Sequence, residues 1–423
     1  MLNFKELRED GTKFQALFSD HLPYSENWFF HSSPYSINHF MKKNFTLVAG
    51  TISVLTLLLF AISCRKEGPR FCACNPNDIV ITQSVFATGL NNPRGLKFGP
   101  DGNLYVAEGG VGGTDSTVGL CDQVPEVGPY LGSDTGARIS RIDHSGTRTT
   151  FVDKIPSSNG ANAGPVSGVA DVAFIGHTLY GLLAGAGCSH GVPNIQNGVF
   201  RVNNDRSWTL INDLSDFYKN HPVQNPNPND FEPDGTPYSM ISLGDRLFSI
   251  EPNHGELDEM SLNGNIHRII DISAFEGHIV PTCMAFHNGN FYVGNLNVFP
   301  ATGSSAIYKI TPQGHISTYA TGFNMVLGVQ FDLLGGLYVL ESTTGNPFPT
   351  PGTGDVIRID PDGSRMTIAS NLNLATAMTF GPDEKLYISD WGFGGAPGMG
   401  QIVQVDLTCA KSHGFKKSTG NVN

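Results

Sequence analysis

The chain has 423 residues, of which 50 are Gly and 15% are charged, and its formal net charge is −12 at pH 7. Much glycine with little charge argues against a coiled coil and against a disordered chain, and it favours short strands joined by tight turns. The acidic balance, without a long run of Lys or Arg, argues against nucleic acid as a partner.

The first 64 residues contain a predicted export signal. Met41-Lys42-Lys43 precedes an apolar run over 45–63, and small residues lead up to Cys64. This order is typical of a bacterial lipoprotein, in which Cys64 becomes the lipidated first residue. The alternative is a plain signal anchor, since about 20 apolar residues are enough to cross a bilayer. We therefore expect 1–40 to be a mis-assigned start or disordered, 41–64 to be the signal, and 65–78 to be a linker.

Export permits disulfides, and the chain has seven cysteines. Cys121 and Cys188 lie in Gly-rich stretches, and we predict that they pair. Cys283 lies in an apolar stretch and is expected in the core. A C-x-C pair beyond the anchor could cross-link or bind metal, but two cysteines cannot complete a zinc site. The cysteines whose pairing stays open are Cys72, Cys74 and Cys409.

The strongest pattern is a six-fold repeat over 79–409. Each copy has an apolar strand, a tight turn, and a second strand that opens with Leu or Phe and an aromatic residue. The last three spacings between the Leu or Phe that opens the second strand of successive copies fall within the about 40–50 residues of a four-stranded propeller blade. The copies are 94–106, 168–180, 238–248, 283–292, 328–338 and 377–387.

A second hairpin follows each of the first five copies, at 139–146, 199–202, 257–264, 307–314 and 356–363. The sixth is split, with one strand at 401–405 and the other at 84–87. Pairing of these two strands would close the ring and leave no exposed sheet edge. The sequence therefore predicts an all-β fold, a six-bladed β-propeller of four-stranded antiparallel blades, followed by a tail over 410–423.

The links between hairpins are long, whereas the turns inside them are short, and the two sets lie on opposite faces of a propeller. Insertions on one face often mark where a repeat protein binds. The alternative is that these loops only cover the rim. The long links are 109–136, 156–166, 185–197, 218–236, 342–353 and 391–400.

An acid or amide recurs four residues after the Leu or Phe in five of the six copies. Alternation along a strand places these side chains equivalently, next to the face with the long links. Ringed oxygens are ligands that Ca²⁺ or Mg²⁺ prefers. Alternatively, each side chain bonds the backbone of its own turn. The five are Glu108, Glu251, Asn295, Glu341 and Asp390, of which the last four are the predicted metal ligands.

Several polar and aromatic residues lie beside this ring in the sequence. His254 and His278 are candidate bases or ligands, or surface histidines without a role. Trp391, followed by glycines and Phe393, is a candidate binding platform or a plug of the channel. Together with Glu108, the predicted binding residues are Asn253, His254, His278 and Trp391. No nucleophile motif, P-loop or dinucleotide fingerprint is present.

The stretch 92–108 resembles the NHL-type propeller repeat. The segments 128–132, 138–142, 182–191 and 198–203 resemble the ScyD/ScyE family of exported propellers, over roughly 79–407. That resemblance implies an exported propeller and supplies no catalytic residues. A wider resemblance to lactonase-type propellers, which hold an axial divalent metal with Glu, Asn and Asp, implies Glu251, Asn295 and Asp390 as ligands. The loop motifs of lactonases are not evident here.

These observations support two main hypotheses. The first is an exported, lipid-anchored and monomeric propeller, at the periplasmic side or cell surface with the outer membrane favoured. It would bind a small molecule or a protein through its long-loop face without acting as an enzyme. The second is a metal-dependent hydrolase or lactonase with axial Ca²⁺ or Mg²⁺. A third, an oxidoreductase or pigment-pathway helper, lacks any motif for an organic cofactor.

Overall fold

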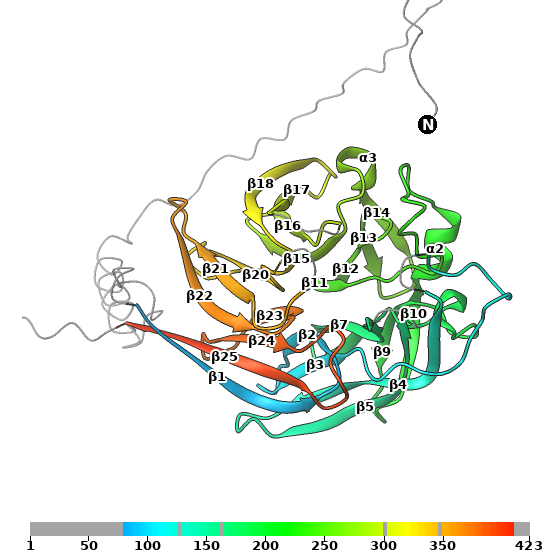
Figure 1. Cartoon of the computed structure of the whole chain (residues 1–423), viewed down its shortest axis with the longest axis horizontal. Coiled ribbons are helices and arrows are strands. Elements are labelled where there is room, and N and C mark those ends of the chain that lie inside the picture. Colours follow the sequence, from blue (N-terminus) through cyan, green and yellow to red (C-terminus); the bar gives the residue numbers. More distant parts are fainter. Residues whose placement is uncertain (1–78, 126–127, 161–163, 299–302, 346–348, 410–423) are drawn as a thin grey trace, which may run out of the picture. The chain divides into compact units, whose positions relative to one another are not determined.

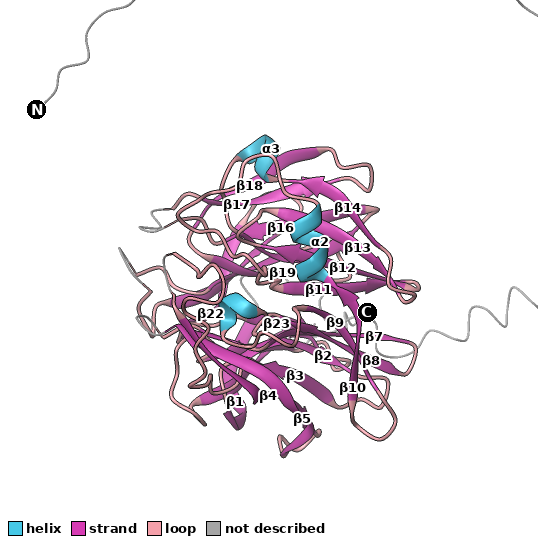
Figure 2. Ribbon diagram, turned by 90° about the vertical axis from the view of Figure 1, so that its right-hand side faces the viewer, coloured by secondary structure: helices cyan, strands magenta, loops and turns pink. Residues whose placement is uncertain are grey.

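A computed structural model of the chain describes residues 79–409 except 126–127, 161–163, 299–302 and 346–348. Their strands form six antiparallel sheets arranged as blades around one axis, which confirms the predicted propeller (Figure 1). Strands make up nearly all of the regular structure (Figure 2). Within this described part, no helix is long and apolar enough to cross a membrane. The predicted signal, Cys64, Cys72, Cys74 and the tail lie outside it.

Each blade begins with the inner hairpin that the repeat predicts. The first strand of each hairpin lines the axis, and tight turns such as that of Gly102, with φ of 77°, join it to the second. In blade order these strands are β2 (Pro93–Phe98) and β3 (Leu104–Glu108), β7 (Val169–Ile175) and β8 (Thr178–Leu183), β11 (Ser239–Leu243) and β12 (Arg246–Glu251), β15 (Pro281–His287) and β16 (Asn290–Asn295), β19 (Val326–Phe331) and β20 (Leu337–Glu341), and β23 (Ala377–Phe380) and β24 (Leu386–Asp390).

The outer hairpins complete the blades. Those of blades one to five are β4 (Tyr130–Ile142) and β5 (Arg148–Gly160), β9 (Gly198–Val202) and β10 (Trp208–Asp213), β13 (Glu256–Ser261) and β14 (Ile266–Asp271), β17 (Ser305–Ile310) and β18 (Ile316–Phe323), and β21 (Gly354–Ile359) and β22 (Arg365–Leu372). Blade one also carries a short fifth strand, β6 (Val166–Ser167), which pairs with the extended end of β5.

The ring closes in blade six, as predicted. There β1 (Ile79–Leu90) pairs with β25 (Gly400–Cys409) in a ladder that runs from Ile79 opposite Cys409 to Leu90 opposite Gly400. These two strands come from opposite ends of the described chain and lie side by side in Figure 1, β1 in blue and β25 in red. The split hairpin in the sequence is therefore the closing contact of the ring.

The aromatic residue of the repeat packs between blades. In four blades it meets, edge to face, a Phe at the end of the next blade's first strand, a geometry worth about 0.5–1.5 kcal/mol beyond area burial. This contact explains why the repeat keeps an aromatic residue at that position. The pairs are Tyr105–Phe174, Tyr292–Phe331, Tyr338–Phe380 and Tyr387–Phe98, with ring centroids 4.7–5.1 Å apart.

The helices of the described residues are short and lie in the connections between strands. One of them is α2 (Leu214–Asn220), whose first turn is capped by the Asp213 carboxylate accepting from the Asp216 N–H. The sequence did not indicate α3 (Ser273–Glu276) or the 3₁₀ turn η2 (Cys188–His190). Both are too short to leave a periodic pattern.

Candidate functional site

The predicted ring residues are all buried, and each bonds within its own blade. Four of them are carboxylates that accept a backbone N–H from the link two to four residues before that blade's first strand. The donors are Asn91 to Glu108 (2.6 Å), Thr236 to Glu251 (3.0 Å), Asn324 to Glu341, and Asn373 to Asp390. The fifth, Asn295, does the equivalent with reversed polarity, because its amide donates to the Ile279 carbonyl at 2.8 Å.

This arrangement is the turn-bonding alternative that the sequence left open. Arg138 also donates to Glu108 at 2.8 Å, which further occupies that carboxylate. In the described residues, no group of three or more His, Cys, Asp or Glu side chains is placed to hold a metal ion. The predicted metal site therefore stays a prediction, and the hydrogen bonds that its residues make to their own turns do not favour it. Its predicted ligands are Glu251, Asn295, Glu341 and Asp390.

Two ring carboxylates face a second carboxylate across the blade. Glu341 lies opposite Asp355, and Glu251 lies opposite Glu256, in the register of the neighbouring strand. Burial, together with the charge and hydrogen bond of Glu341, raises the pKa of Asp355 to about 7. The Glu341–Asp355 pair therefore holds one proton up to about neutral pH.

His254 completes a buried ionic group in blade three. Its Nδ1 lies 3.5 Å from Glu256 and its Nε2 bonds the Glu232 carbonyl at 2.9 Å. Burial lowers the pKa of His254, but Glu251 and Glu256 outweigh it and raise that pKa to about 9. His254 is thus a charged structural residue at neutral pH rather than a free base.

The predicted disulfide between Cys121 and Cys188 is present, with the Cα atoms 6.3 Å apart. It joins the long link after β3 to η2 in blade two, and Thr117 supports it by donating to the Cys188 carbonyl. Cys283 is a buried free cysteine, as expected. Cys409 is paired through its backbone with Ile79.

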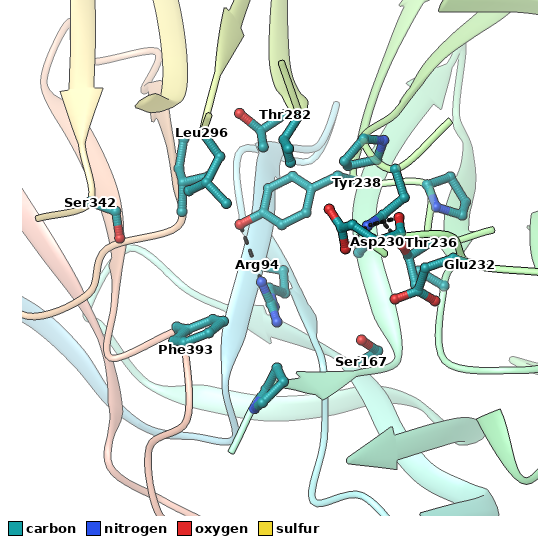
Figure 3. A pocket seen from close by; sticks show the side chains of 18 of the residues that line it. Arg94, Ser167, Asp230, Glu232, Thr236, Tyr238, Thr282, Leu296, Ser342 and Phe393 are labelled. Atoms are coloured by element: carbon teal, nitrogen blue, oxygen red, sulfur yellow. Dashed lines mark hydrogen bonds between the residues drawn. The ribbon is translucent and has the colours of Figure 1, made fainter. Parts of the chain in front are cut away.

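A pocket of about 270 Å³ opens at the axis on the face with the long links. All six blades or their links contribute to its lining, from Arg94 in blade one to Phe393 in the last long link. Figure 3 shows Arg94 and Tyr238 pointing toward each other, with Asp230 and Glu232 to one side and Phe393 to the other. A larger hollow of about 740 Å³ lies on the opposite face, bounded by short turns of blades one and two.

The acidic residues of the axial pocket have partners in the protein. Asp230 accepts from Asn253 Nδ2 at 2.8 Å and lies 2.7 Å from His278 Nε2. Glu232 lies 3.1 Å from His190 Nε2, and the His190 ring packs at a tilt against Tyr130 in the pocket wall. These contacts fix the carboxylates against the wall.

Behind Glu232, a chain of polar contacts leads outward. His190 Nδ1 meets the Ser189 hydroxyl at 3.2 Å, and that hydroxyl donates to Asp234 at 2.7 Å. Asp234 in turn receives Lys219 Nζ at 2.6 Å, and Lys219 is half exposed. The disulfide at Cys188 thus adjoins the segment that positions this wall.

Of the predicted binding residues, Asn253 lines the pocket and His278 reaches it through Asp230. Glu108, His254 and Trp391 are not among the lining residues. The sequence reasoning missed Arg94, Tyr130 and Tyr238 as site residues.

A signal for two of these three was present. Arg94 and Tyr130 both lie in segments that carry the family resemblance, yet a propeller motif alone does not tell a lining residue from a structural one. Asp230 and Glu232 lie in an irregular link, where sequence gives no register.

No protein-family model and no curated protein sequence matches the chain. Among solved structures, it is similar to a Bacteroides thetaiotaomicron protein of unknown function, at 13% identity and a TM-score of 0.49 over 78% of this chain and 76% of that one. It is also similar to a Xanthomonas campestris gluconolactonase, at 13% identity and 0.48 over 81% and 99%. A third is the PQQ-bound aldose sugar dehydrogenase of Streptomyces coelicolor, at 12% identity and 0.45 over 79% and 100%.

Proposed function

We propose that the chain is an exported propeller, tethered to the membrane by lipid on Cys64, that binds a small molecule in its axial pocket. The observation that carries this proposal is the pocket itself, which lies on the long-loop face and is lined from around the whole ring. Its mixture of apolar walls and a few convergent polar groups is typical of small-molecule sites. A volume of about 270 Å³ is at the small end of such sites.

Binding rather than chemistry is the activity that the described side chains support best. Asp230 is hydrogen-bonded to His278 and Asn253, Glu232 lies 3.1 Å from His190, and the described lining contains no cysteine. The lining residues Ser167 and Ser342 have no histidine among their hydrogen-bond partners in the described chain, so neither resembles an activated nucleophile.

Blocking the pocket tests the binding proposal. Val298 lines the mouth and is 47% exposed, so Val298→Trp fills the opening without disturbing the core. The matched control is Leu333→Trp, in the exposed turn between β19 and β20. A fragment screen by ligand-observed NMR on the full chain in detergent should find ligands that Val298→Trp loses and Leu333→Trp keeps. Ligands retained by both variants would place binding elsewhere and refute the proposal.

The tether is tested by fractionation. Cys64→Ala should release the protein from the membrane fraction and abolish labelling by a fatty-acid analogue. Retention of Cys64→Ala in the membrane would favour the signal-anchor alternative.

The metal-dependent hydrolase is tested by elemental analysis after Ca²⁺ or Mg²⁺ loading. About one ion per chain that Glu251→Gln removes would overturn the turn-bonding role of the ring. Since Glu251 accepts from the Thr236 and His254 N–H groups, we expect no such ion.

A further inference from the structure

Arg94 is a buried charge that faces the axial pocket without a carboxylate partner. It is 8% exposed and is the only arginine or lysine among the described lining residues. Its Nη1 donates to the Tyr238 hydroxyl at 3.2 Å and its Nη2 to the Val166 carbonyl at 2.7 Å. No carboxylate oxygen of the described residues lies within ion-pair distance of it, although a guanidinium offers five N–H donors.

A buried charge without a counter-ion is costly, so it is retained where something compensates it. The Tyr238 ring supplies part of this, because the guanidinium carbon lies 5.4 Å from the ring centroid. The acidic residues of the pocket do not, because Asp230 is bonded to Asn253 and His278 and Glu232 lies against His190. The Arg94 guanidinium is therefore the positively charged hydrogen-bond donor of the pocket that lacks a carboxylate partner among the described residues.

The remaining lining of the pocket is largely apolar. It surrounds Arg94 with aliphatic and aromatic side chains, among them Val169, Val280, Leu296, Leu327, Leu374 and Phe393. Such walls favour a ligand whose body is a short hydrocarbon or an aromatic ring.

We propose that the ligand of the axial pocket is a small monocarboxylate with an apolar body, whose carboxylate is held by the Arg94 guanidinium. This inference rests on the proposed function and specifies its ligand class. Arg matches a carboxylate better than Lys does, because its planar fork forms two parallel hydrogen bonds. The chain as a whole carries −12, so the attraction for an anion is local to Arg94.

Matched probes test this proposal by isothermal titration of the full chain in detergent. The probes are hexanoate and 3-phenylpropanoate, each compared with its neutral primary amide, which has nearly the same shape. We expect each carboxylate to bind the native protein at least ten-fold more tightly than its amide. Arg94→Gln should remove this preference and Arg94→Lys should restore part of it.

The matched control is Arg246→Gln, which makes the same charge change at a half-exposed side chain at the start of β12, next to a turn of the opposite face. It should leave the carboxylate preference unchanged. Thermal unfolding shows whether each variant folds. If Arg94→Gln does not fold, Arg94→Lys takes its place; it keeps the charge but loses the planar fork, and should retain only part of the preference.

The outcomes separate this inference from the proposed function. Equal binding of acids and amides to the native protein, or a preference that survives in Arg94→Gln, would overturn the carboxylate assignment while leaving small-molecule binding in place. Failure of all four probes to bind the folded native protein would count against both. Loss of the preference in Arg94→Gln alone, with its thermal midpoint preserved, supports the assignment, because a purely structural role would not move acid–amide selectivity.

Discussion

Removal of the disulfide between Cys121 and Cys188 should destabilise the propeller substantially. The two cysteines are 67 residues apart in sequence. Closing a loop of that size removes conformational entropy from the unfolded chain that is worth about 4 kcal/mol at 25 °C in the chain-entropy treatment. The double substitution Cys121→Ser and Cys188→Ser should therefore lower the free energy of unfolding by about that amount.

Guanidinium unfolding followed by tryptophan fluorescence measures this loss. Reducing the native protein should reproduce it, whereas Cys283→Ala, which removes a buried free thiol, should leave the response to reductant intact. A loss below about 1 kcal/mol in the double variant would refute the reasoning, since the loop term alone is several times larger.

The same double variant should also weaken ligand binding. Cys188 begins η2, and His190 at its end packs against Tyr130 in the pocket wall with ring centroids 4.5 Å apart. Releasing η2 frees this wall, so affinity in the axial pocket should fall even under conditions where the chain is fully folded.

Three further predictions concern the buried ionic groups. Asp355→Asn should stabilise the protein at pH 8 by on the order of 1 kcal/mol. The folded-state pKa of Asp355 is raised to about 7, so its ionisation beside Glu341 costs stability as the pH rises above the pKa that Asp355 has in the unfolded chain. An unchanged urea midpoint at pH 8 would contradict this. His254, whose pKa is raised to about 9, contributes stability that is complete below its unfolded pKa near 6.5 and is lost as pH rises through 9; His254→Gln should therefore flatten the fall in unfolding midpoint between pH 7 and 10. Asp390→Ala should cost about 2–3 kcal/mol, because the Asn373 N–H loses a charge-assisted partner, and added Ca²⁺ should not alter the native midpoint.

The blades could be predicted from sequence because their signals are local and repeated. The alternation of apolar residues, the Asp-Gly and Asn-Gly turns and the recurring Leu-aromatic pair each depend on a few neighbouring residues. Only five of the six expected outer hairpins were complete in the sequence. The remaining strands at 84–87 and 401–405 therefore indicated that the two ends pair and close the ring, as they do.

The site could be predicted only in part. The ring acids were located correctly, but whether an oxygen bonds a metal or the N–H of Asn373 depends on the path of a link that has no pattern. Arg94 was visible in a motif, yet its role depends on Tyr238, two blades away, and on there being no carboxylate of the described residues within ion-pair distance. Such relations between distant segments leave no periodic trace in the chain.

The pairing of β1 with β25 also constrains the order of folding. The two strands that close the ring lie at opposite ends of the described chain, so β1 is synthesised long before its partner exists. A chain made from its amino terminus onward holds β1, with outward-facing Val80 and Val85, unpaired until the last blade emerges. Ring closure is then the final, slow and non-local step, and the interval before it is when the chain is most exposed to misassembly and to proteolysis.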